Sequence, residues 1–384
     1  MDTWVRPISR GWVVRGEVPG PDVDEFAEPD AVVAALASPG AAGDTLLAVQ
    51  HPARTPAALA SGLDLNAALP SARAALARIR ARHYRSLSGF VAAYRISGPD
   101  GVAAGLLCLV DLGGLGSGRT HVRHTEEVYP QVVAERAAVL SGLGCATSAA
   151  LLVPSSGGER LTEAVTAAGA RLGAPDVSTV DPGGRRHELW VVPSGTVQTR
   201  LLAAVSRADL LVADGNHRVA AAAATGQGAL LALVTAGPRL EIGAIHRVLD
   251  GFSAARLTAA WRAAGLEVRP TADRTPPSRP GTAVVLAGAE ALRVTLPVFD
   301  PLVIDHEVVE RVLFAQALGV DPDGPAVRPL PAGRPVPPGP GAVVQLAPVP
   351  FEIVLKVHDA GRRMPRKATY FTPKPRGGLV LAQI

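Results

Sequence analysis

Residues 210–225 read LLVADGNHRVAAAAAT, and this stretch indicates the fold more clearly than any other. The apolar residues at its start predict a buried strand, and the alanine run after them predicts a helix. Gly215 between the two permits a left-handed turn because it has no Cβ. The sequence therefore predicts a strand, a tight turn and a helix whose first N–H groups form an anion site.

The turn carries an unusual density of polar side chains, Asp214-Gly215-Asn216-His217-Arg218. The Arg218 guanidinium suits bidentate binding of phosphate, and His217 can donate a hydrogen bond or a proton near neutral pH. Asp214 could cap the helix, bind a divalent ion through nucleotide oxygens, or accept a hydroxyl proton. An ordinary strand-to-helix turn would explain Asp-Gly alone, but the complete set favours a functional site.

Strands and helices alternate irregularly along the rest of the chain, with hairpins. That pattern predicts a mixed α/β (α+β) protein and disfavours a doubly wound sheet. Further segments are predicted as helices at 68–85, 126–142, 158–169, 308–318 and from 351, and as strands at 90–97, 102–111, 149–154, 187–193, 229–234 and 378–382. Residues 322–350 are rich in Pro and Gly and predict a long loop or short extended segments. Three regions are expected: 1–195, 196–295 with the turn, and 296–384.

Composition excludes several classes of protein. With 48% hydrophobic and 19% charged residues among 384, the chain is not intrinsically disordered. The two cysteines, Cys108 and Cys145, provide neither a disulfide framework nor a cysteine zinc site. The uncharged stretch 219–236 contains a Thr-Gly-Gln-Gly break and predicts helix, turn and strand, not a membrane span. The first residues lack the features of a secretion signal, so a soluble cytoplasmic protein is expected.

The basic residues are unevenly distributed. All three lysines, Lys356, Lys367 and Lys374, lie in the last 34 residues, where seven Lys/Arg face only two Asp/Glu. The formal charge of +4 is therefore a property of this segment, and the rest of the chain does not suggest a nucleic-acid binder. A basic tail could neutralise a phosphate, or it could be a solvated terminal helix. We expect the tail to reach the functional site.

The strand–DG-x-HR–helix arrangement resembles the ParB/sulfiredoxin-like fold. That fold includes a free serine kinase with the same signature, and its turn and helix N-terminus hold nucleotide phosphates. The chain as a whole is similar to the family catalogued as domain of unknown function 1015. The matching pieces are Arg123-His124 with Glu126-Glu127, Glu135-Arg136, 187–190, 213–218, 244–247 and 364–374. The last, MPRKATYFTPK, resembles that family's MP-x-KSTYF-x-PK ending.

The chain also departs from the family pattern. The family's early Pro-Pro-Tyr-Asp segment is absent, and residues 16–29 read GEVPGPDVDEFAEP instead. Asn216 replaces the first histidine of the usual DGHHR turn. The family's His-Glu-x-x-Thr is here His124-Thr125-Glu126-Glu127, so either glutamate could be the working carboxylate.

Two further groups of residues are candidates. His121, His124, Glu126 and Glu127 could suggest a metal site, with His121, His124 and Glu127 on one helix face, but a catalytic base role for one of the glutamates fits better. The alternative is an ordinary charged helix start. The pair at 246–247 (His-Arg) follows an apolar run, and it would be either an anion contact at a strand end or a surface pair.

The resemblance implies a nucleotide-dependent small-molecule kinase acting on free serine or a similar hydroxyl-bearing metabolite, with ATP or ADP as nucleotide and Mg²⁺ presumed. The alternative is a non-catalytic nucleotide-binding regulator of the ParB-like type. Neither nucleic acid nor membrane is an expected partner. The candidate catalytic residues are Asp214, His217, Glu126 and Glu127. The candidate nucleotide- or phosphate-binding residues are Gly215, Asn216, Arg218, His246, Arg247, Lys367, Thr369 and Lys374.

Overall fold

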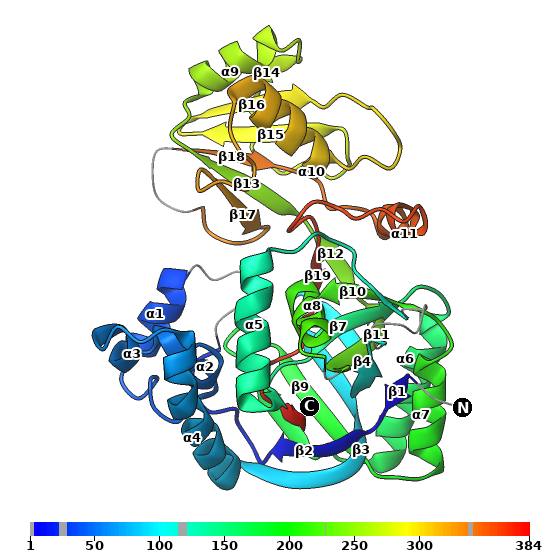
Figure 1. Ribbon diagram of the computed structural model, residues 1–384. Coiled ribbons are helices and arrows are strands. Elements are labelled where there is room, and N and C mark those ends of the chain that lie inside the picture. The colour runs from blue at the N-terminus through cyan, green and yellow to red at the C-terminus, as the bar shows by residue number, and fades with distance from the viewer. Residues whose placement is uncertain (1–3, 23–28, 114–120, 227, 337–340) are drawn as a thin grey trace. The chain divides into compact units, whose positions relative to one another are not determined.

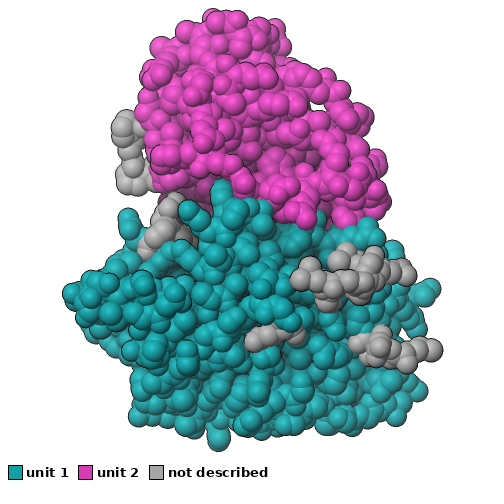
Figure 2. All heavy atoms as spheres, in the orientation of Figure 1, with its two compact units in different colours: residues 1–124, 128–240, 373–384 teal, residues 125–127, 241–372 magenta. Residues whose placement is uncertain are grey.

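The computed structural model describes residues 4–22, 29–113, 121–226, 228–336 and 341–384 (Figure 1). The chain divides into two compact units (Figure 2). Unit 1 comprises residues 1–124, 128–240 and 373–384, and unit 2 comprises residues 125–127 and 241–372. The three expected regions remain a prediction about domain organisation, and the two units are bounded at other residues.

Unit 1 is built on a large mixed sheet. The order along its main path is β5 (Val122–Arg123), β10 (Leu210–Asp214), β7 (Ala150–Pro154), β11 (Ala229–Arg239), β4 (Gly101–Asp111), β3 (Tyr84–Gly98), β2 (Ile8–Val14), β20 (Val380–Gln383) and β6 (Cys145–Ala146). Strands β10 and β5 are parallel, as are β11 and β7, and the other pairs on this path are antiparallel. The predicted mixed α/β class is therefore confirmed.

The predicted hairpin is the centre of this sheet. Gly98 of β3 pairs with Gly101 of β4, so the turn between them is short. Eight consecutive residues of β4, 103–110, are buried, because β3 and β11 flank the strand and helices cover it. Short strands β1 (Val5–Arg6) and β9 (Arg186–Val192) pair with β4 and β3, and β8 (Val177–Val180) pairs with β9.

The helices of unit 1 are rich in alanine, and the longest is α4. They are α1 (Pro29–Ala37), α2 (Leu46–Gln50), η1 (Pro52–Arg54), α3 (Pro56–Ala60), α4 (Leu65–His83), α5 (Pro130–Leu143), α6 (Gly158–Leu172), α7 (Thr196–Val205) and α8 (Asn216–Ala224). Helix α6 packs against β3, β4 and β11, α7 packs against β1 and β4, and α5 contacts α4 and α8 (Figure 1). The helix predicted at 126–142 starts at Pro130 instead, because proline is favoured in the first turn.

Unit 2 contains an antiparallel sheet with its own core. Its strand order is β14 (Val268–Pro270), β16 (Glu290–Thr295), β15 (Thr282–Ala287), β18 (Gly341–Gln345), β13 (Ile245–Asp250) and β17 (Val327–Pro331). Helix α9 (Ala254–Ala263) contributes Trp261, whose Nε1 donates to the carbonyl oxygen of Leu313 at 3.0 Å. Leu313 lies in η2 (Val309–Gln316), a π-helix that follows α10 (Asp305–Val308) where one helix was predicted at 308–318.

The last part of unit 2 leads back to unit 1 along the chain. Helix α11 (Phe351–Asp359) starts where the sequence predicts it, and β19 (Tyr370–Thr372) pairs with β12 (Glu241–Gly243). The Pro-rich stretch 322–350 holds β17 and β18, so short extended segments are the better description of it. Across the described residues, none of the helices is both long and apolar enough to cross a membrane.

Candidate functional site

The β10–α8 junction has the predicted strand–turn–helix form. Gly215 adopts a left-handed conformation with φ 96° and is itself the N-cap residue of α8. A Cβ at this position would lie 2.8 Å from Nε of Arg218, so the turn and the arginine together require glycine. No side chain caps the helix, and the capping role considered for Asp214 is therefore not the one it has.

The Asp214 carboxylate instead holds two cations. Its Oδ1 accepts from Nζ of Lys374 at 2.5 Å, and its Oδ2 accepts from Nη2 of Arg218. The other terminal nitrogen of Arg218 donates to the carbonyl oxygen of Ala149. All three charged side chains are at most 16% exposed. Two cations and one carboxylate leave a net positive charge beside the N-terminus of α8, which favours an anion at this point.

Lys374 reaches this cluster because the end of the chain is fixed in unit 1. Strand β20 pairs with both β2 and β6. The hydroxyl of Tyr84 donates to the carbonyl oxygen of Gly378 at 2.6 Å, and the N–H of Arg376 donates to the hydroxyl oxygen of Tyr94 at 3.2 Å. Lys374 therefore lies beside Asp214 and Arg218, and the expectation that the tail reaches a functional site stays a prediction.

Asn216 and His217 are buried and turned to other contacts. Nε2 of His217 accepts from the backbone N–H of Tyr129 at 3.0 Å, and the two rings stack at 5.7 Å between centroids. Asn216 Oδ1 lies 3.1 Å from Nδ1 of His124. An Nε2 that accepts a backbone hydrogen bond belongs to a neutral imidazole with its proton on Nδ1. These contacts favour a role in anchoring the chain before α5 to α8.

A cavity of about 730 Å³ adjoins the Asp214 cluster, and all of its described lining residues belong to unit 1. Its wall includes Asp214, Arg218 and Lys374, whereas Gly215, Asn216 and His217 are not among the described residues that line it. Further charged side chains in the wall are Asp22, Arg54, Glu135, Arg136, Asp181, Arg185 and Arg376. The described wall thus has six Lys/Arg and four Asp/Glu, and its volume is in the range of small-molecule sites.

A buried chain of hydrogen bonds ends at this cavity, and sequence reasoning missed it. Tyr94, which accepts from the N–H of Arg376, lies with its hydroxyl 2.8 Å from Nδ1 of His187. Nε2 of His187 lies 3.2 Å from Oδ2 of Asp181. The order of donors follows: Tyr94 donates to His187, and His187 donates to Asp181. Nothing in the sequence spacing indicates this chain, because β3 and β9 become neighbours only in the sheet.

Burial and hydrogen bonds keep Tyr94, His187 and Asp181 each in one protonation state near pH 7. Burial lowers the pKa of His187 and raises the pKa of Tyr94, so both are neutral near pH 7. Burial acts to raise the pKa of Asp181, but hydrogen bonds from the backbone and guanidinium of Arg185 and from His187 leave it below its ordinary value. Asp181 is therefore a permanent carboxylate in the cavity wall.

The residues around Asp214 do not fit a resident magnesium ion. Both oxygens of Asp214 already accept hydrogen bonds from cationic side chains. Where the structure describes the chain, no group of three or more His, Cys, Asp or Glu side chains could hold a metal ion. The histidines considered as metal ligands from the sequence have other contacts, since His121 bonds to Asp209 at 3.0 Å and His124 to Asn216.

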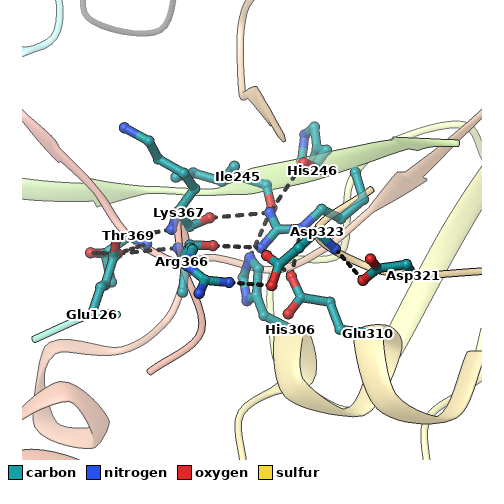
Figure 3. Close-up of polar contacts among 12 residues, drawn as sticks. Glu126, Ile245, His246, His306, Glu310, Asp321, Asp323, Arg366, Lys367 and Thr369 are labelled. Atoms are coloured by element: carbon teal, nitrogen blue, oxygen red, sulfur yellow. Dashed lines mark hydrogen bonds and ion pairs between the residues drawn. The ribbon is translucent and has the colours of Figure 1, made fainter. Parts of the chain in front are cut away.

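The predicted residues of unit 2 form a second cluster, shown in Figure 3. Glu126 accepts hydrogen bonds from the backbone N–H groups of Lys367, Ala368 and Thr369 at 2.8–3.1 Å, and from the Thr369 hydroxyl at 2.6 Å. Lys367 has φ 54°, the sole positive value of a non-glycine residue in the described chain. Glu126 is buried, and its contacts favour a structural clasp on residues 367–369.

Arg247 and His246 also have contacts within unit 2. Arg247 is buried, pairs with Glu310 at 2.7 Å and donates to the carbonyl oxygens of Arg366 and Lys367 at 3.0 and 3.1 Å (Figure 3). Nδ1 of His246 accepts from the N–H of Leu346 at 3.1 Å. Burial and the neighbouring Arg247 lower the pKa of His246 to about 4, so its ring is neutral.

The position of this pair differs from both readings of the sequence. The two residues lie inside β13, which pairs with strands on both sides, and not at an exposed strand end. Glu127, by contrast, is half-exposed and lies 3.7 Å from Arg363.

The structure thus places the predicted residues in two groups. Asp214, Arg218 and Lys374 meet in unit 1, and a second group in unit 2 comprises Glu126, His246, Arg247, Lys367 and Thr369. The functions assigned to them stay predictions. Residues of the cavity wall that sequence reasoning missed are His51, Arg54, Asp181, Arg185 and Arg376. Only Arg376, two residues after Lys374, carried a signal, since it belongs to the basic tail.

Solved structures with a similar arrangement of elements are distant in sequence. SbnI with C-terminal truncation from Staphylococcus aureus has 12% identity and a TM-score of 0.42, covering 72% of this chain and 87% of that one. A mutant of free serine kinase in complex with ADP has 11% identity and a TM-score of 0.39, with coverages of 71% and 92%. A conserved hypothetical protein from Pyrococcus furiosus has 12% identity and a TM-score of 0.38, with coverages of 71% and 95%.

No curated protein matches the chain. A family model does: the one described as "Protein of unknown function (DUF1015)" matches residues 86–297, which is more than half of the chain. The matched range includes the hairpin at the centre of the unit 1 sheet, the β10–α8 junction and the first half of unit 2. The chain therefore belongs to the DUF1015 family.

Proposed function

We propose that the unit 1 cavity binds a nucleoside phosphate, and that the protein transfers a phosphoryl group from it to the hydroxyl of free serine or a similar metabolite. The observation that carries the proposal is the meeting of Lys374 and Arg218 on Asp214, in the wall of a cavity and at the start of α8. Two cationic side chains in a cavity wall can bind phosphate oxygens through charge-assisted hydrogen bonds.

The proposed chemistry needs positioning and charge neutralisation more than covalent help from the protein. The acceptor oxygen attacks the terminal phosphorus, an O–P bond forms, and the bond from phosphorus to the leaving nucleotide oxygen breaks. Lys374 and Arg218 neutralise charge on the transferred and leaving groups. The hydroxyl proton passes to Asp214, whose Oδ1 becomes accessible when phosphate draws Lys374 away from it.

The test is calorimetric titration with ADP, ATP, AMP and adenosine. Lys374→Met should weaken nucleotide binding about tenfold or more, because a charge-assisted hydrogen bond to phosphate is lost. Adenosine should bind equally weakly to wild type and variant. Arg200→Gln is the control, since Arg200 is exposed on α7 and is not among the described cavity residues. A folded Lys374→Met protein with unchanged nucleotide affinity would contradict the phosphate site.

A second experiment distinguishes a phosphoryl-transferring enzyme from a non-catalytic regulator. ³¹P NMR of the protein with ATP or ADP and L-serine should show a new phosphate monoester if transfer occurs. Nucleotide binding without transfer to any of a panel of hydroxyl compounds would instead favour the non-catalytic nucleotide-binding regulator.

A further inference from the structure

Most charged side chains of the cavity wall are paired with one another. Asp22 lies 3.7 Å from Arg376, and Asp181 lies 3.2 Å from Arg185. Asp214 has both Lys374 and Arg218, as described above. These pairs hold three of the four carboxylates in the described wall. The remaining one, Glu135 on α5, has no ion pair with any described residue.

Arg54 differs from the other cations of the wall. It is the last residue of η1, and its guanidinium makes no hydrogen bond or ion pair with any described part of the chain. A guanidinium has five N–H donors and is always charged, so this half-buried side chain can donate to a ligand in the cavity. An anionic ligand would complete its contacts with charge-assisted hydrogen bonds.

Two other basic side chains lie close to Arg54. His51 immediately precedes η1, and Arg136 is on α5, and both line the same cavity. Burial, followed by the positive charges of Arg54 and Arg136, lowers the pKa of His51 to about 4. The ring is therefore neutral near pH 7 and can donate one hydrogen bond. Both guanidinium groups and this ring line the same cavity.

The cavity thus has positive charge at two points. One is the Asp214 cluster, to which the proposed function assigns the nucleotide phosphates. The other consists of His51, Arg54 and Arg136, and Val132 and Val139 of α5 add apolar surface to the same wall. An acid with a short carbon skeleton would satisfy both the guanidinium donors and this apolar surface.

We propose that His51, Arg54 and Arg136 form a second anion subsite, which binds the carboxylate or phosphate monoester group of a small acid beside the nucleotide. The subsite deepens the proposed function, on which its pairing with a nucleotide rests. Arg54 and Arg136 supply charge-assisted hydrogen bonds, and the neutral ring of His51 supplies one more donor. The acid is thereby distinguished from a neutral compound of the same size.

The experiment uses three probes with one carbon skeleton: glycerol, glycerate and glycerol 3-phosphate. Each is titrated calorimetrically into the full-length protein, with and without saturating ADP. We expect either acid to bind and glycerol not to bind. Stronger binding of glycerate identifies a carboxylate as the natural group, and stronger binding of glycerol 3-phosphate identifies a phosphate monoester.

Arg54→Gln is the decisive variant, with Arg200→Gln as the matched control. It should weaken the acid about tenfold or more while changing ADP affinity less than about twofold. Arg54 makes no hydrogen bond or ion pair in the described structure. The thermal midpoint of the Arg54→Gln protein without ligand should therefore be equal to or above that of wild type. Acid binding that is unchanged in Arg54→Gln, absent in wild type, or lost together with ADP binding would overturn the subsite.

The two proposals fail in different ways. If wild type does not bind ADP but binds an acid through Arg54, the proposed function fails and the subsite stands. A second readout comes from NMR titration of His51. An anion held beside this ring should raise the pKa of His51 from its low value, whereas glycerol should leave it unchanged, and an unchanged pKa at saturating acid would contradict the proposed contact.

Discussion

The sequence suggests several roles for Asp214, and the fold gives its carboxylate one set of contacts. A carboxylate before a helix is an ordinary N-cap, but here Gly215 has that position and Asp214 turns to Lys374 and Arg218. The carboxylate keeps two cations within hydrogen-bond distance of a single group. In the absence of this negative charge they would repel each other in a poorly solvated wall.

Asp214→Asn tests this assignment. An amide has one acceptor oxygen and presents N–H donors to the second cation, so we expect a loss of about 1–3 kcal/mol in the free energy of unfolding. Nucleotide affinity should also fall if Asp214 mainly positions the two cations. If it is the base, transfer should be lost while binding is retained. Urea unfolding and calorimetry distinguish these outcomes.

Asp209→Asn is the matched control for that variant, because Asp209 also contacts two basic side chains, His121 and Arg123, and is not among the described cavity residues. It should change stability only slightly and leave nucleotide affinity unchanged. An equal effect of both substitutions on nucleotide binding would show that Asp214 has no special role.

At the scale of elements, the turn at residues 365–369 is fixed by side chains from distant segments. Glu126 gathers the N–H groups of 367–369, and Arg247 binds the carbonyl oxygens on the other side of the same turn (Figure 3). These contacts hold Lys367 in a left-handed conformation, which a side chain adopts only at a cost of about 1 kcal/mol. The contacts of Glu126 and those of Arg247 are therefore both needed to hold this turn in its geometry.

Glu126→Gln and Glu127→Gln form a matched pair for this turn. In Glu126→Gln one acceptor oxygen becomes an amide donor facing backbone N–H groups, so we expect a loss of about 2 kcal/mol or more in stability. Glu127→Gln removes only a half-exposed ion pair at 3.7 Å and should cost less than about 1 kcal/mol.

Hydrogen exchange provides the local measurement for this pair. The amides of 367–369 should exchange faster in Glu126→Gln and at the wild-type rate in Glu127→Gln. Equal exchange in both variants would contradict the clasp.

At the scale of the whole molecule, buried neutral histidines link stability to pH. The pKa values of His51 and His246 are lowered to about 4, and that of His306 to about 3, in each case chiefly by burial. The ordinary value in an unfolded chain is 6.5. The unfolded chain therefore binds protons first as the pH falls.

The sign of the effect follows from linkage. These groups contribute stability that is complete above pH 6.5 and is lost as the pH falls towards 4. Urea midpoints measured from about pH 8 to about pH 4.5 should decrease below pH 6.5. His246→Asn retains an acceptor for the Leu346 N–H without a titrating ring, so its midpoint should decrease less steeply. A midpoint that rises on acidification through this range would contradict the assignment.

Much of the architecture could be predicted locally. The helix at 68–85, the hairpin at 90–111 and the junction at 210–225 were all expected and are all present. Each could be predicted because the spacing of its apolar residues is typical of a helix or a strand. The helix start at Pro130 and the π-helix η2 were not, since neighbouring segments decide where such elements begin and how tightly they wind. Within the site, the DGNHR turn was visible because its polar residues are adjacent.

The sequence by itself determined the mixed α/β class, the tight turn at Gly215 and the lysines of the tail, because each follows from local composition or from the geometry of a few consecutive residues. Only the tertiary structure decided that Lys374 meets Asp214, that Glu126 clasps residues 367–369, and that Arg54 faces a cavity without a partner in the described chain. Those contacts join residues far apart in sequence. Their formation depends on strand order and burial, which no local pattern encodes.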